Sequence, residues 1–532
     1  AELLFGVAPH ALTQSQSIVL AARLRAPNAA TDTLVRRATV LAARRGRADD
    51  ERITRDAARV VRIPLASPPR ASLAPHLAAQ LLTATRAAVV TTTLDARLQR
   101  VAIASLRSHL LGLRDQRVDD GAVLVADNLS GEVLAYVGSS GSLSQARFVD
   151  GVRAKRQAGS TLKPFLYALA IDERRLTAAS PLRDSPLEIF LTTGSYRPTN
   201  YDHEFRGAIS LRTALGSSLN VPAVRTLELI GGAAFLDRLR RAGFTTLDRP
   251  AEHYGPGLAL GSGEVTLWDL VNAYRMLANR GVTTPLRLLP VGAHDPPDRP
   301  TTVFGDEATF VIADILADRD ARAATFGRQS ALDSTSWAAV KTGTSTDMRD
   351  NWCIGFSNRY TVGVWVGNFS GAPMGDVSGV SGAAPVWSEI LHWLHRHEPS
   401  TAPAPPAGVV PVALEDGRRE WFLRGTEPVG GRIVAAPPRP RIAAPIAGAI
   451  LALDPEMPAA VQRVALESRP RDPAWSWWLG DERLGDAAAP LLWPPRPGLH
   501  RLELRNAAGD TVDAIQFRVR ASHALPQPPA AP

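Results

Sequence analysis

AGSTLKPFLYALA, Ala158–Ala170, decides how the rest of the chain is interpreted, because a serine precedes a lysine by three residues at the start of a helical run. Of the 60 basic residues, only three are lysines: Lys155, Lys163 and Lys341. A helix that begins at Ser160 carries Lys163 on the same face, one turn further on. A desolvated lysine amine can lose its proton, whereas an arginine guanidinium cannot. Lys163 can therefore act as the base that takes the proton of Ser160.

A second lysine motif supports this interpretation, because Ser-x-x-Lys alone is also the pattern of a helix-capping serine followed by a surface lysine. The motif is VKTGTS, Val340–Ser345, at the end of an apolar segment. Gly343 lets a ligand approach the strand backbone closely, and the N–H of Thr344 can point into a cleft. Lys341 and Thr342 offer a cation and a hydroxyl for a substrate carboxylate. Two of the three lysines thus stand in motif positions.

A third element, GSSLNVPAV (Gly216–Val224), lies between these two motifs. Ser218 and Asn220 place a hydroxyl and an amide two residues apart, on a loop that enters a helix. Ser218 can relay a proton with Lys163, and Asn220 can hold the peptide carbonyl of a substrate. Ser-x-Asn by itself means little, so its value lies in its order and spacing between the other motifs.

Ser-x-x-Lys, Ser-x-Asn and Lys-Thr-Gly, in this order, resemble the signature of penicillin-binding proteins and serine β-lactamases. The sequence around these motifs resembles the transpeptidase domain of class A penicillin-binding proteins over roughly residues 90–400. The segments that carry this resemblance are QAGSTLKPFLYALA, SLRTALGSSLNVPAV, LGSGEVTLWDLVNAYRMLANRG and VKTGTSTDMRDNWCIGFSNRYTVGVWVGN, preceded by TTLDARLQ and GEVLAYVGS. EWFLRGTEP, PIAGAILALDPEMP and GLHRLELRNAAGD resemble the 1C type, and AELLFGVAPHALTQSQSIVLAARLRAPN resembles the last part of a glycosyltransferase domain.

The resemblance implies acyl transfer on a serine. Ser160 attacks the carbonyl between the last two D-alanines of a peptidoglycan stem peptide, and an amine of a neighbouring stem resolves the acyl-enzyme into a crosslink. β-Lactams mimic the substrate and acylate the same serine. The N–H groups of Ser160 and Thr344 stabilise the oxyanion, and Ser218 returns the proton to the leaving D-alanine. The implied catalytic residues are Ser160, Lys163, Ser218, Asn220 and Lys341; the implied substrate-binding residues are Thr342, Gly343 and Thr344.

Two other functions stay open. Hydrolysis, by a D,D-carboxypeptidase or a β-lactamase, needs a base for the deacylating water, and DERR (Asp172–Arg175) and DHEF (Asp202–Phe205) keep that question open. A catalytically silent cell-wall binding module is the alternative from a different class, with the C-terminal region as its working part. No cofactor or metal is expected, because the 11 histidines show no ligand spacing with Cys or acidic residues.

The predicted fold class is α+β, with a helical block inserted into one sheet and a small all-β sandwich after it. Strand-like runs at 121–139 and from 336 onward enclose predicted helices near 160, 210–242, 265–280 and 304–318. Val89–Thr93 is a short β-like segment, followed by a helix from Asp95. The expected domains are a glycosyltransferase remnant (1–60), a linker (61–90), the transpeptidase domain (91–400), a Pro-rich linker and tail (401–438) and the sandwich (439–525). Within the remnant, Ser15–Asn28 and Leu34–Arg47 are predicted helices.

Composition and charge indicate how many domains, disulfides and membrane spans the chain has and which kinds of partner it could bind. The 532 residues suggest several domains, and the single Cys353, expected in a buried strand, excludes an internal disulfide framework. The net charge of +8 fits either an arginine-rich solvated surface or attraction to an anionic partner; no basic block indicates nucleic acid. No run of eighteen apolar residues indicates a transmembrane helix.

The expected location and partners follow from the resemblance. The chain opens without Met, which suggests a fragment that lacks the family's N-terminal anchor and the glutamates of its glycosyltransferase. The expected location is periplasmic, at the extracytoplasmic face of the bacterial inner membrane. The expected partners are peptidoglycan stem peptides, glycan strands and β-lactams, with a cell-wall or envelope protein for the C-terminal domain. There, Trp475, Trp477, Trp478 and Trp493 are expected in the core, with a saccharide or partner platform as the alternative.

Overall fold

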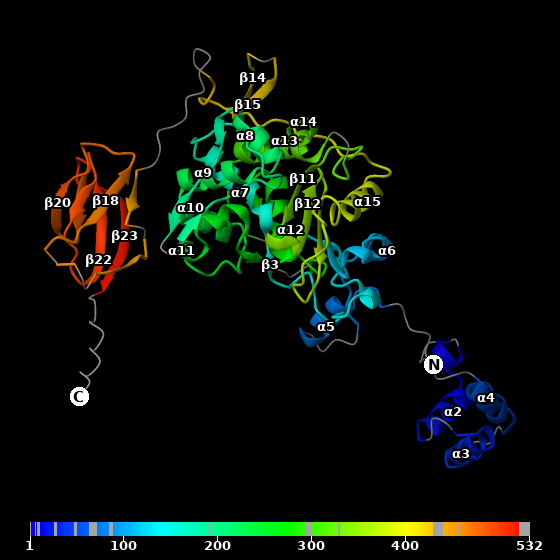
Figure 1. Ribbon diagram of the computed structural model, residues 1–532. Coiled ribbons are helices and arrows are strands. Elements are labelled where there is room, and N and C mark those ends of the chain that lie inside the picture. The colour runs from blue at the N-terminus through cyan, green and yellow to red at the C-terminus, as the bar shows by residue number, and fades with distance from the viewer. Residues whose placement is uncertain are drawn as a thin grey trace, which may run out of the picture. The chain divides into compact units, whose positions relative to one another are not determined.

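The computed structural model describes residues 2–5, 7, 11–25, 29–46, 50–62, 72–84, 89–191, 194–292, 299–327, 330–415, 417–428, 440–445, 447–454, 457–458 and 460–520. The chain forms two compact units, Ala1–Leu73 and Ala74–Pro532 (Figure 1). The second unit holds a central domain, a hairpin and a C-terminal β domain. None of the described helices is long and apolar enough to cross a membrane.

A five-stranded antiparallel sheet organises the central domain, in the order β11-β12-β13-β1-β2. Its strands are β1 (Asp120–Asp127), β2 (Val133–Val137), β11 (Ala339–Thr344), β12 (Asp350–Phe356) and β13 (Tyr360–Gly367). β1 pairs with β13, its neighbour in space but far from it in sequence. The prediction that a helical block is inserted between strands of one sheet is therefore confirmed.

Both faces of the sheet are covered. Successive residues of a strand point to opposite faces, and both sets of side chains are buried here. Ala122 and Leu124 face one apolar cluster with Trp352, whereas Val123 and Val125 face the other with Cys353. The helix α7 (Lys163–Asp172) packs in the first cluster and is buried from Lys163 to Ile171. The second cluster lies under α6 (Ala96–Gly112) and α15 (Ala384–Leu394). Cys353 is a free, buried core residue, as predicted.

The inserted block contains most of the helices. They are the 3-10 turn η4 (Gly159–Leu162), α8 (Leu211–Gly216), α9 (Asn220–Ile230), α10 (Gly232–Arg241), α11 (Ala251–Tyr254), the 3-10 segment η5 (Gly255–Leu260), α12 (Leu267–Ala278), α13 (Asp306–Ala317) and α14 (Arg319–Phe326). Four short strand pairs connect them: β3 (Arg156–Gln157) with β8 (Glu264–Val265), β4 (Pro181–Asp184) with β7 (Gly207–Ser210), β5 (Ile189–Leu191) with β6 (Gly194–Tyr196), and β9 (Val282–Thr283) with β10 (Thr301–Thr302).

Two predicted segments differ from the structure. Val89–Thr93 forms no strand; Thr93 instead donates from its hydroxyl to the carbonyl of Val133. The expected linker 61–90 holds α5 (Pro75–Ala84), whose Leu77 is buried in the central core. The prolines of this segment suggested a connector. A proline at the first position of a helix is tolerated, however, because the N–H that it lacks would have no partner within the helix.

The segment 401–438, expected as a Pro-rich linker and tail, contains a hairpin of β14 (Val409–Ala413) and β15 (Arg419–Leu423). Its Val409 and Leu423 belong to the core of the central domain. Figure 1 shows this hairpin beside α8 and α13. It is therefore an extension of the central domain, not a free linker.

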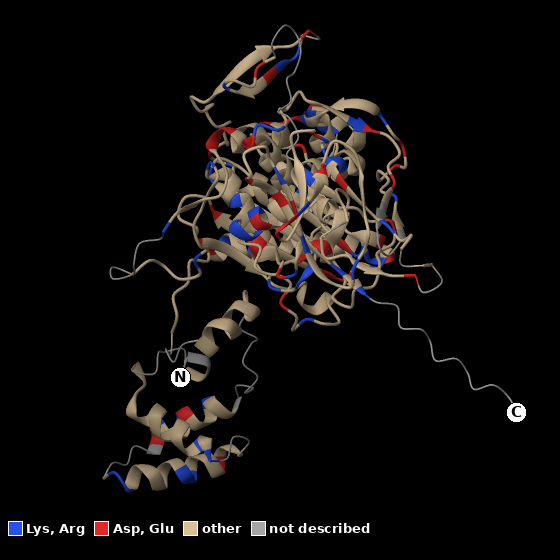
Figure 2. Cartoon of the chain, turned by 90° about the vertical axis from the view of Figure 1, so that its left-hand side faces the viewer, with Lys and Arg blue, Asp and Glu red and all other residues tan. Residues whose placement is uncertain are grey.

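Charged residues of both signs are interspersed over the described chain, as Figure 2 shows. Several arginines are bonded internally, such as Arg275, whose guanidinium is buried and donates to the carbonyl of Thr284. This distribution favours the interpretation of the positive charge as arginine-rich composition spread over a solvated surface.

The C-terminal domain consists of two sheets that share one core. The first is β16 (Arg441–Ala444), β18 (Val464–Arg469) and β21 (Leu491–Trp493). The second is β17 (Ile450–Ala452), β23 (Thr511–Arg520), β22 (Gly498–Arg505), β19 (Ser476–Leu479) and β20 (Glu482–Asp486). The sheet-rich fold expected for this region is thus confirmed.

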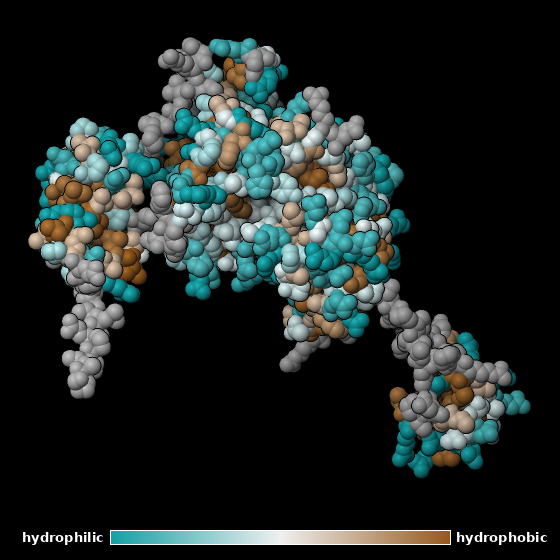
Figure 3. Space-filling view, viewed as in Figure 1, coloured by the Kyte–Doolittle hydropathy of each residue, from teal (hydrophilic) through white to brown (hydrophobic). Residues whose placement is uncertain are grey.

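The tryptophans of this domain divide between its core and its surface. Trp477 and Trp493 are buried in the core, and Trp475 packs against its margin. Trp478 lies under the guanidinium of Arg505, 4.4 Å from its ring centre. Figure 3 shows apolar residues on the face of this domain that is in view. Leu492 and Leu499 are among the exposed apolar residues of the domain. The core expectation therefore holds for two of the four residues and in part for a third.

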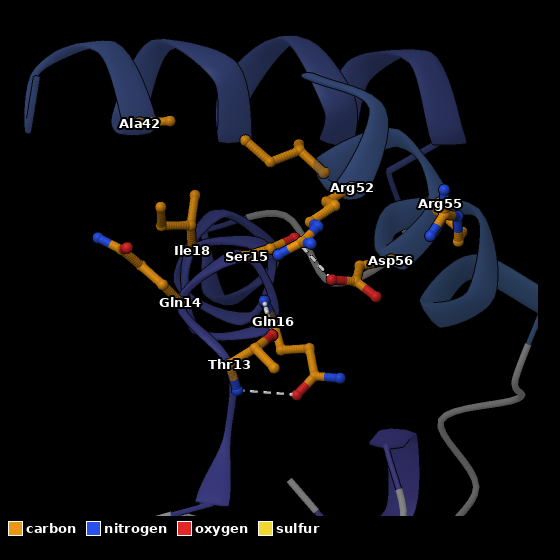
Figure 4. Close-up of a pocket in the computed structure, with 10 residues that line it drawn as sticks. Thr13, Gln14, Ser15, Gln16, Ile18, Ala42, Arg52, Arg55 and Asp56 are labelled. Carbon is orange, nitrogen blue, oxygen red and sulfur yellow. Dashed lines mark hydrogen bonds between the residues drawn. The ribbon is translucent and has the colours of Figure 1, made fainter. Parts of the chain in front are cut away.

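The N-terminal unit is helical, with α1 (Glu2–Phe5), α2 (Gln14–Leu24), α3 (Thr31–Ala43) and α4 (Asp50–Arg62). The two predicted helices are present; their expected ends, Asn28 and Arg47, lie outside the described residues. Thr13 and Gln16 form a capping box at the start of α2. Beside it, a pocket of about 370 Å³ lies between α2 and α4, where Ser15 donates to Asp56 (Figure 4).

Replacing Trp387 tests the core on the α15 side of the sheet. Its ring fills the space that Gly355 leaves free, where an added Cβ would lie 2.6 Å from the indole. We expect Trp387→Ala to lower the free energy of unfolding by about 3–5 kcal/mol, because a large cavity remains. Denaturant unfolding measures this. Leu129→Ala is the control, because Leu129 is 92% exposed; equal effects of the two substitutions would contradict the assignment of the core.

Candidate active site

The three motifs meet at one cleft of about 910 Å³ in the central domain. η4 and α7 contribute Ser160 and Lys163, the α8–α9 connection contributes Ser218 and Asn220, and the end of β11 contributes the Lys-Thr-Gly motif. The motif residues that line the cleft are Ser160, Ser218, Asn220, Thr342 and Thr344. Lys163 and Lys341 are buried behind them, and the backbone of Gly343 lies against Ala158.

Two backbone segments, at Gly261 and at Thr344, hold the turn that carries Ser160. Gly159 has φ +55° and its N–H donates to the carbonyl of Gly261 over 3.0 Å. A Cβ added to Gly261 would lie 1.9 Å from the oxygen of Gly159, and one added to Gly159 would lie 2.8 Å from the oxygen of Thr344. No side chain fits between these segments, so the turn is fixed from both sides by main chain.

Lys163 is fully buried and donates from Nζ to the carbonyl of Ser218 and to Oδ1 of Asn220, each over 2.6 Å. Burial lowers the pKa of Lys163 well below its usual range, and the neighbouring Lys341 lowers it further. The two acceptors occupy both N–H bonds of a neutral amine and leave its lone pair free. Lys163 therefore has the chemistry of a base.

Ser160 is half-buried at the cleft surface. In the described part of the chain, no hydrogen bond joins its Oγ to Nζ of Lys163. Catalytic hydrogen bonds are often long in unliganded sites and tighten when substrate binds. The structure thus places Ser160 and Lys163 within one helical turn of each other, with no hydrogen bond between their side chains.

The Ser218 hydroxyl differs from its expected position. It accepts a hydrogen bond from Nζ of Lys341 over 2.7 Å, while only the Ser218 carbonyl contacts Lys163. Ser218 has φ +59°, a left-handed conformation that turns its carbonyl and its side chain toward different lysines. The hydrogen bond of the Ser218 hydroxyl is thus to Lys341, and the proton relay with Lys163 stays a prediction.

Lys341 also donates to the carbonyl of Thr342 over 2.8 Å. Burial lowers the pKa of Lys341 to about 7. A substrate carboxylate nearby would raise this pKa again, because it favours the charged form. The residue can thus hold or release a proton near neutral pH, which an arginine could not do.

The glycine of the Lys-Thr-Gly motif lies against the turn that carries Ser160. A Cβ at Gly343 would lie 2.7 Å from Cγ2 of Thr161 and 2.9 Å from the oxygen of Ala158. The Ser160 turn thus packs closely against the strand backbone at Gly343, and the approach of a ligand to this strand stays a prediction. Next to it, Oγ1 of Thr344 accepts a hydrogen bond from the N–H of Gly379 over 3.1 Å, which brings a further loop to the cleft wall.

Asn220 is held by residues that sequence reasoning missed. Its Nδ2 donates to the carbonyl of Thr199 and its backbone N–H to Oδ1 of Asn200, both over 2.8 Å. Asn200 in turn donates to both carboxylate oxygens of the fully buried Asp184. These residues precede Asn220 by many positions and have no local pattern that relates them to it.

The two acidic segments considered for hydrolysis are in different places. Asp172 pairs with Arg238 at the end of α7 and does not line the cleft. Asp202 and His203 do line it, and Asp202 pairs with Arg206 over 2.5 Å. The hydrogen bond from Arg206 lowers the pKa of Asp202. Across the described residues, no group of three His, Cys, Asp or Glu side chains is arranged to bind a metal.

Comparison with known proteins defines the class. The family described as penicillin binding protein transpeptidase domain matches residues 121–390, half of the chain, and the Penicillin-Binding Protein C-terminus Family matches residues 431–517. The crystal structure of penicillin-binding protein 1A from Haemophilus influenzae shares the fold, with a TM-score of 0.64 at 18% identity over 81% of this chain and 88% of that one.

Two curated relatives are similar in sequence. Penicillin-binding protein 1C of Escherichia coli (strain K12) is 36% identical over 320 residues, which are 60% of this chain and 40% of the relative. Penicillin-binding protein 2D of Bacillus subtilis (strain 168) is 30% identical over 366 residues, 64% of this chain and 51% of the relative. The chain belongs to the penicillin-binding proteins with a transpeptidase domain and, among them, to the class A proteins of the 1C type. It spans about half the length of these relatives, or less.

Gly261→Ala tests the contact between backbones at the nucleophile turn. The added methyl would overlap the oxygen of Gly159, so we expect acylation of Ser160 by benzylpenicillin to slow about 100-fold. Gly207→Ala is the matched control, because Gly207 has a similar φ, +73°, but nothing within 4 Å of its Cβ. Time-resolved intact-mass measurement follows the adduct; equal rates in the two variants would show that the contact does not position Ser160.

Lys341→Met tests the lowered pKa of the buried lysine. Lys341 binds its proton only below about pH 7 in the folded protein but up to about pH 10.5 when unfolded. Between these values the unfolded chain binds more protons, so this residue makes stability rise with pH by up to about 1.4 kcal/mol per unit. Unfolding at pH 7.5, 8.5 and 9.5 should show a flatter rise for Lys341→Met than for Lys155→Met; parallel curves would contradict the shift.

Proposed function

We propose that the chain is a serine D,D-transpeptidase that crosslinks peptidoglycan stem peptides through an acyl-enzyme on Ser160. The observation that carries this proposal is the buried Lys163, whose lowered pKa and two acceptors fit a neutral base beside the serine. Membership in the penicillin-binding proteins supports the serine acyl transfer itself. Specificity for a D-Ala-D-Ala terminus is proposed in addition to this acyl transfer.

In the first step, Lys163 takes the proton of Ser160 Oγ, which forms a bond to the carbonyl carbon before the last D-alanine. The N–H groups of Ser160 and Thr344 are proposed to bind the oxyanion. The C–N bond then breaks, and the leaving amine takes up a proton. The Ser218 hydroxyl lines the cleft and contacts Lys341, so we assign the delivery of this proton to that pair.

Substrate binding is assigned to the end of β11 and the α8–α9 connection. Thr342 and Thr344 line the cleft and are proposed to bind the terminal carboxylate, with the charge of Lys341 behind them. Gly343 shapes this edge through its contact with the nucleophile turn. Asn220 already uses Oδ1 for Lys163 and one N–H for Thr199, which leaves its second N–H for the peptide carbonyl of the donor.

The second step transfers the acyl group to an amine of a neighbouring stem and restores Ser160 Oγ–H.

A second candidate function is hydrolysis by a D,D-carboxypeptidase or β-lactamase. The observation that supports this alternative is the presence of Asp202 and His203 at the cleft. The ion pair of Asp202 with Arg206 disfavours it as a water-activating base. We propose an extracytoplasmic location at the inner membrane, with stem peptides, glycan strands and β-lactams as ligands.

Intact-mass spectrometry after incubation with benzylpenicillin, with peptide mapping, tests the acyl-enzyme. We expect a lasting adduct on Ser160 and an acylation rate about 100- to 10,000-fold lower in Lys163→Arg, because arginine cannot serve as the base. Lys155→Arg is the matched control and should acylate at the wild-type rate. An equal rate in Lys163→Arg would exclude Lys163 as the base.

The lifetime of the adduct separates the alternatives. A short-lived adduct with turnover of the drug would favour the lactamase, and no adduct would favour the silent binding module. A stem-peptide donor offered with an amine acceptor then separates crosslinking from trimming, since a carboxypeptidase releases D-alanine without forming the new peptide bond.

A further inference from the structure

The hairpin that precedes the C-terminal domain contributes a buried charge to α8, the helix that leads into the Ser-x-Asn loop. Glu420, on β15, is 4% exposed and receives two hydrogen bonds from Arg212 on α8. Nε donates to Oε2 over 2.8 Å and Nη2 to Oε1 over 2.6 Å. This paired geometry fixes the plane of the guanidinium.

Arg212 has two further acidic partners. Nη2 donates to Asp314 near the end of α13 over 2.6 Å, and Nη1 donates to Asp318 over 2.9 Å. Asp318 also caps α14, where its Oδ1 accepts from the N–H groups of Asp320 and Ala321. Among these three acids, Glu420 is the most buried and the only one that comes from outside the helical block.

Helix α8 and its contacts with α14 connect Arg212 to the Ser-x-Asn loop. α8 runs from Leu211 to Gly216, about 9 Å of helix, and ends at Ser217, whose hydroxyl donates to the carbonyl of Ala321 over 2.8 Å. A Cβ at Gly216 would lie 2.6 Å from that of Ala321. Arg212 therefore holds α8 at one end, through Asp318 and α14, and Ser218 lies two residues beyond Gly216, the last residue of α8.

The hairpin is itself firmly seated on the central domain. Trp421 packs edge-on against Phe310 of α13, with ring centres 5.3 Å apart. The carbonyl of Arg424 accepts a hydrogen bond from Arg174, just after α7, over 3.0 Å. A displacement of β15 would therefore be passed to Arg212 and not absorbed by the hairpin.

We propose that Glu420 is a positioning residue of the transpeptidase site: through Arg212 it fixes α8, and thereby the Ser218 hydroxyl and the Asn220 amide that face the two lysines. The role rests on the proposed function. It deepens that function, because it makes the β14–β15 hairpin a part of the catalytic domain that supports the cleft from behind.

Glu420→Gln tests this role, because it keeps the shape of the side chain and removes the charge that orients Arg212. The second-order rate of acylation by benzylpenicillin should fall about 10- to 100-fold at a temperature where the variant is folded. Its pH profile should also shift, because the Ser218–Lys341 contact changes. Glu420→Asp keeps the charge and should recover part of the rate. Glu415→Gln, the same change at an exposed residue of the same hairpin, should match the wild type.

The outcomes separate this role from the function on which it rests. Wild-type protein that forms no adduct overturns the proposed function. Wild-type protein that acylates while Glu420→Gln acylates equally fast, whatever its melting temperature, overturns only the positioning role. If Glu420→Gln folds poorly, rates are normalised to the fraction that forms adduct, and Arg212→Lys, which keeps the charge but loses the paired geometry, must show the same loss of rate and shift in profile.

Discussion

The active cleft depends on the burial of two lysine amines around a single residue. Lys163 contacts the carbonyl of Ser218 and Lys341 contacts its hydroxyl. Two ammonium groups this close and this buried disfavour each other's charge, so the fold keeps at least one amine ready to accept a proton. The left-handed conformation of Ser218 lets one residue serve both. The nucleophile turn, the α8–α9 connection and the end of β11 are placed where this arrangement requires them.

The surrounding fold explains how the two lysine amines stay buried although their desolvation is unfavourable. The two lysines come from a fully buried helix and from a sheet strand covered on both faces, neither of which can move toward solvent without opening a core. The acceptors of Lys163 come from a third element. Asn200 bonds to it directly, and Arg212 on the preceding α8 pairs with three acids, Asp314, Asp318 and Glu420. Stability of the core and reactivity of the site therefore have the same structural origin.

Much of this architecture could be predicted from the sequence, where the pattern is local. Two strand-like runs around an Asn-Leu-Ser-Gly turn predict the hairpin at 121–139, and the rarity of lysine draws attention to both buried amines. The partners of Asn220 could not be predicted, because Asn200 and Asp184 reach it only through tertiary packing. The same holds for Ser218, whose choice between two lysines depends on one backbone torsion, and for Pro75, which opens a helix in what composition indicated to be a linker.

The contact of Gly159 with Gly261 on one side and with Thr344 on the other has an evolutionary consequence. Because main chain meets main chain there, no larger residue can be introduced at either glycine without displacing the nucleophile. Variation that keeps the position of Ser160 is therefore expected among the side chains that line the cleft, such as Tyr196, Tyr201 and Val380. Substitution of either glycine is expected to cost reactivity, whereas substitution along the cleft wall is expected to change which molecule the site recognises.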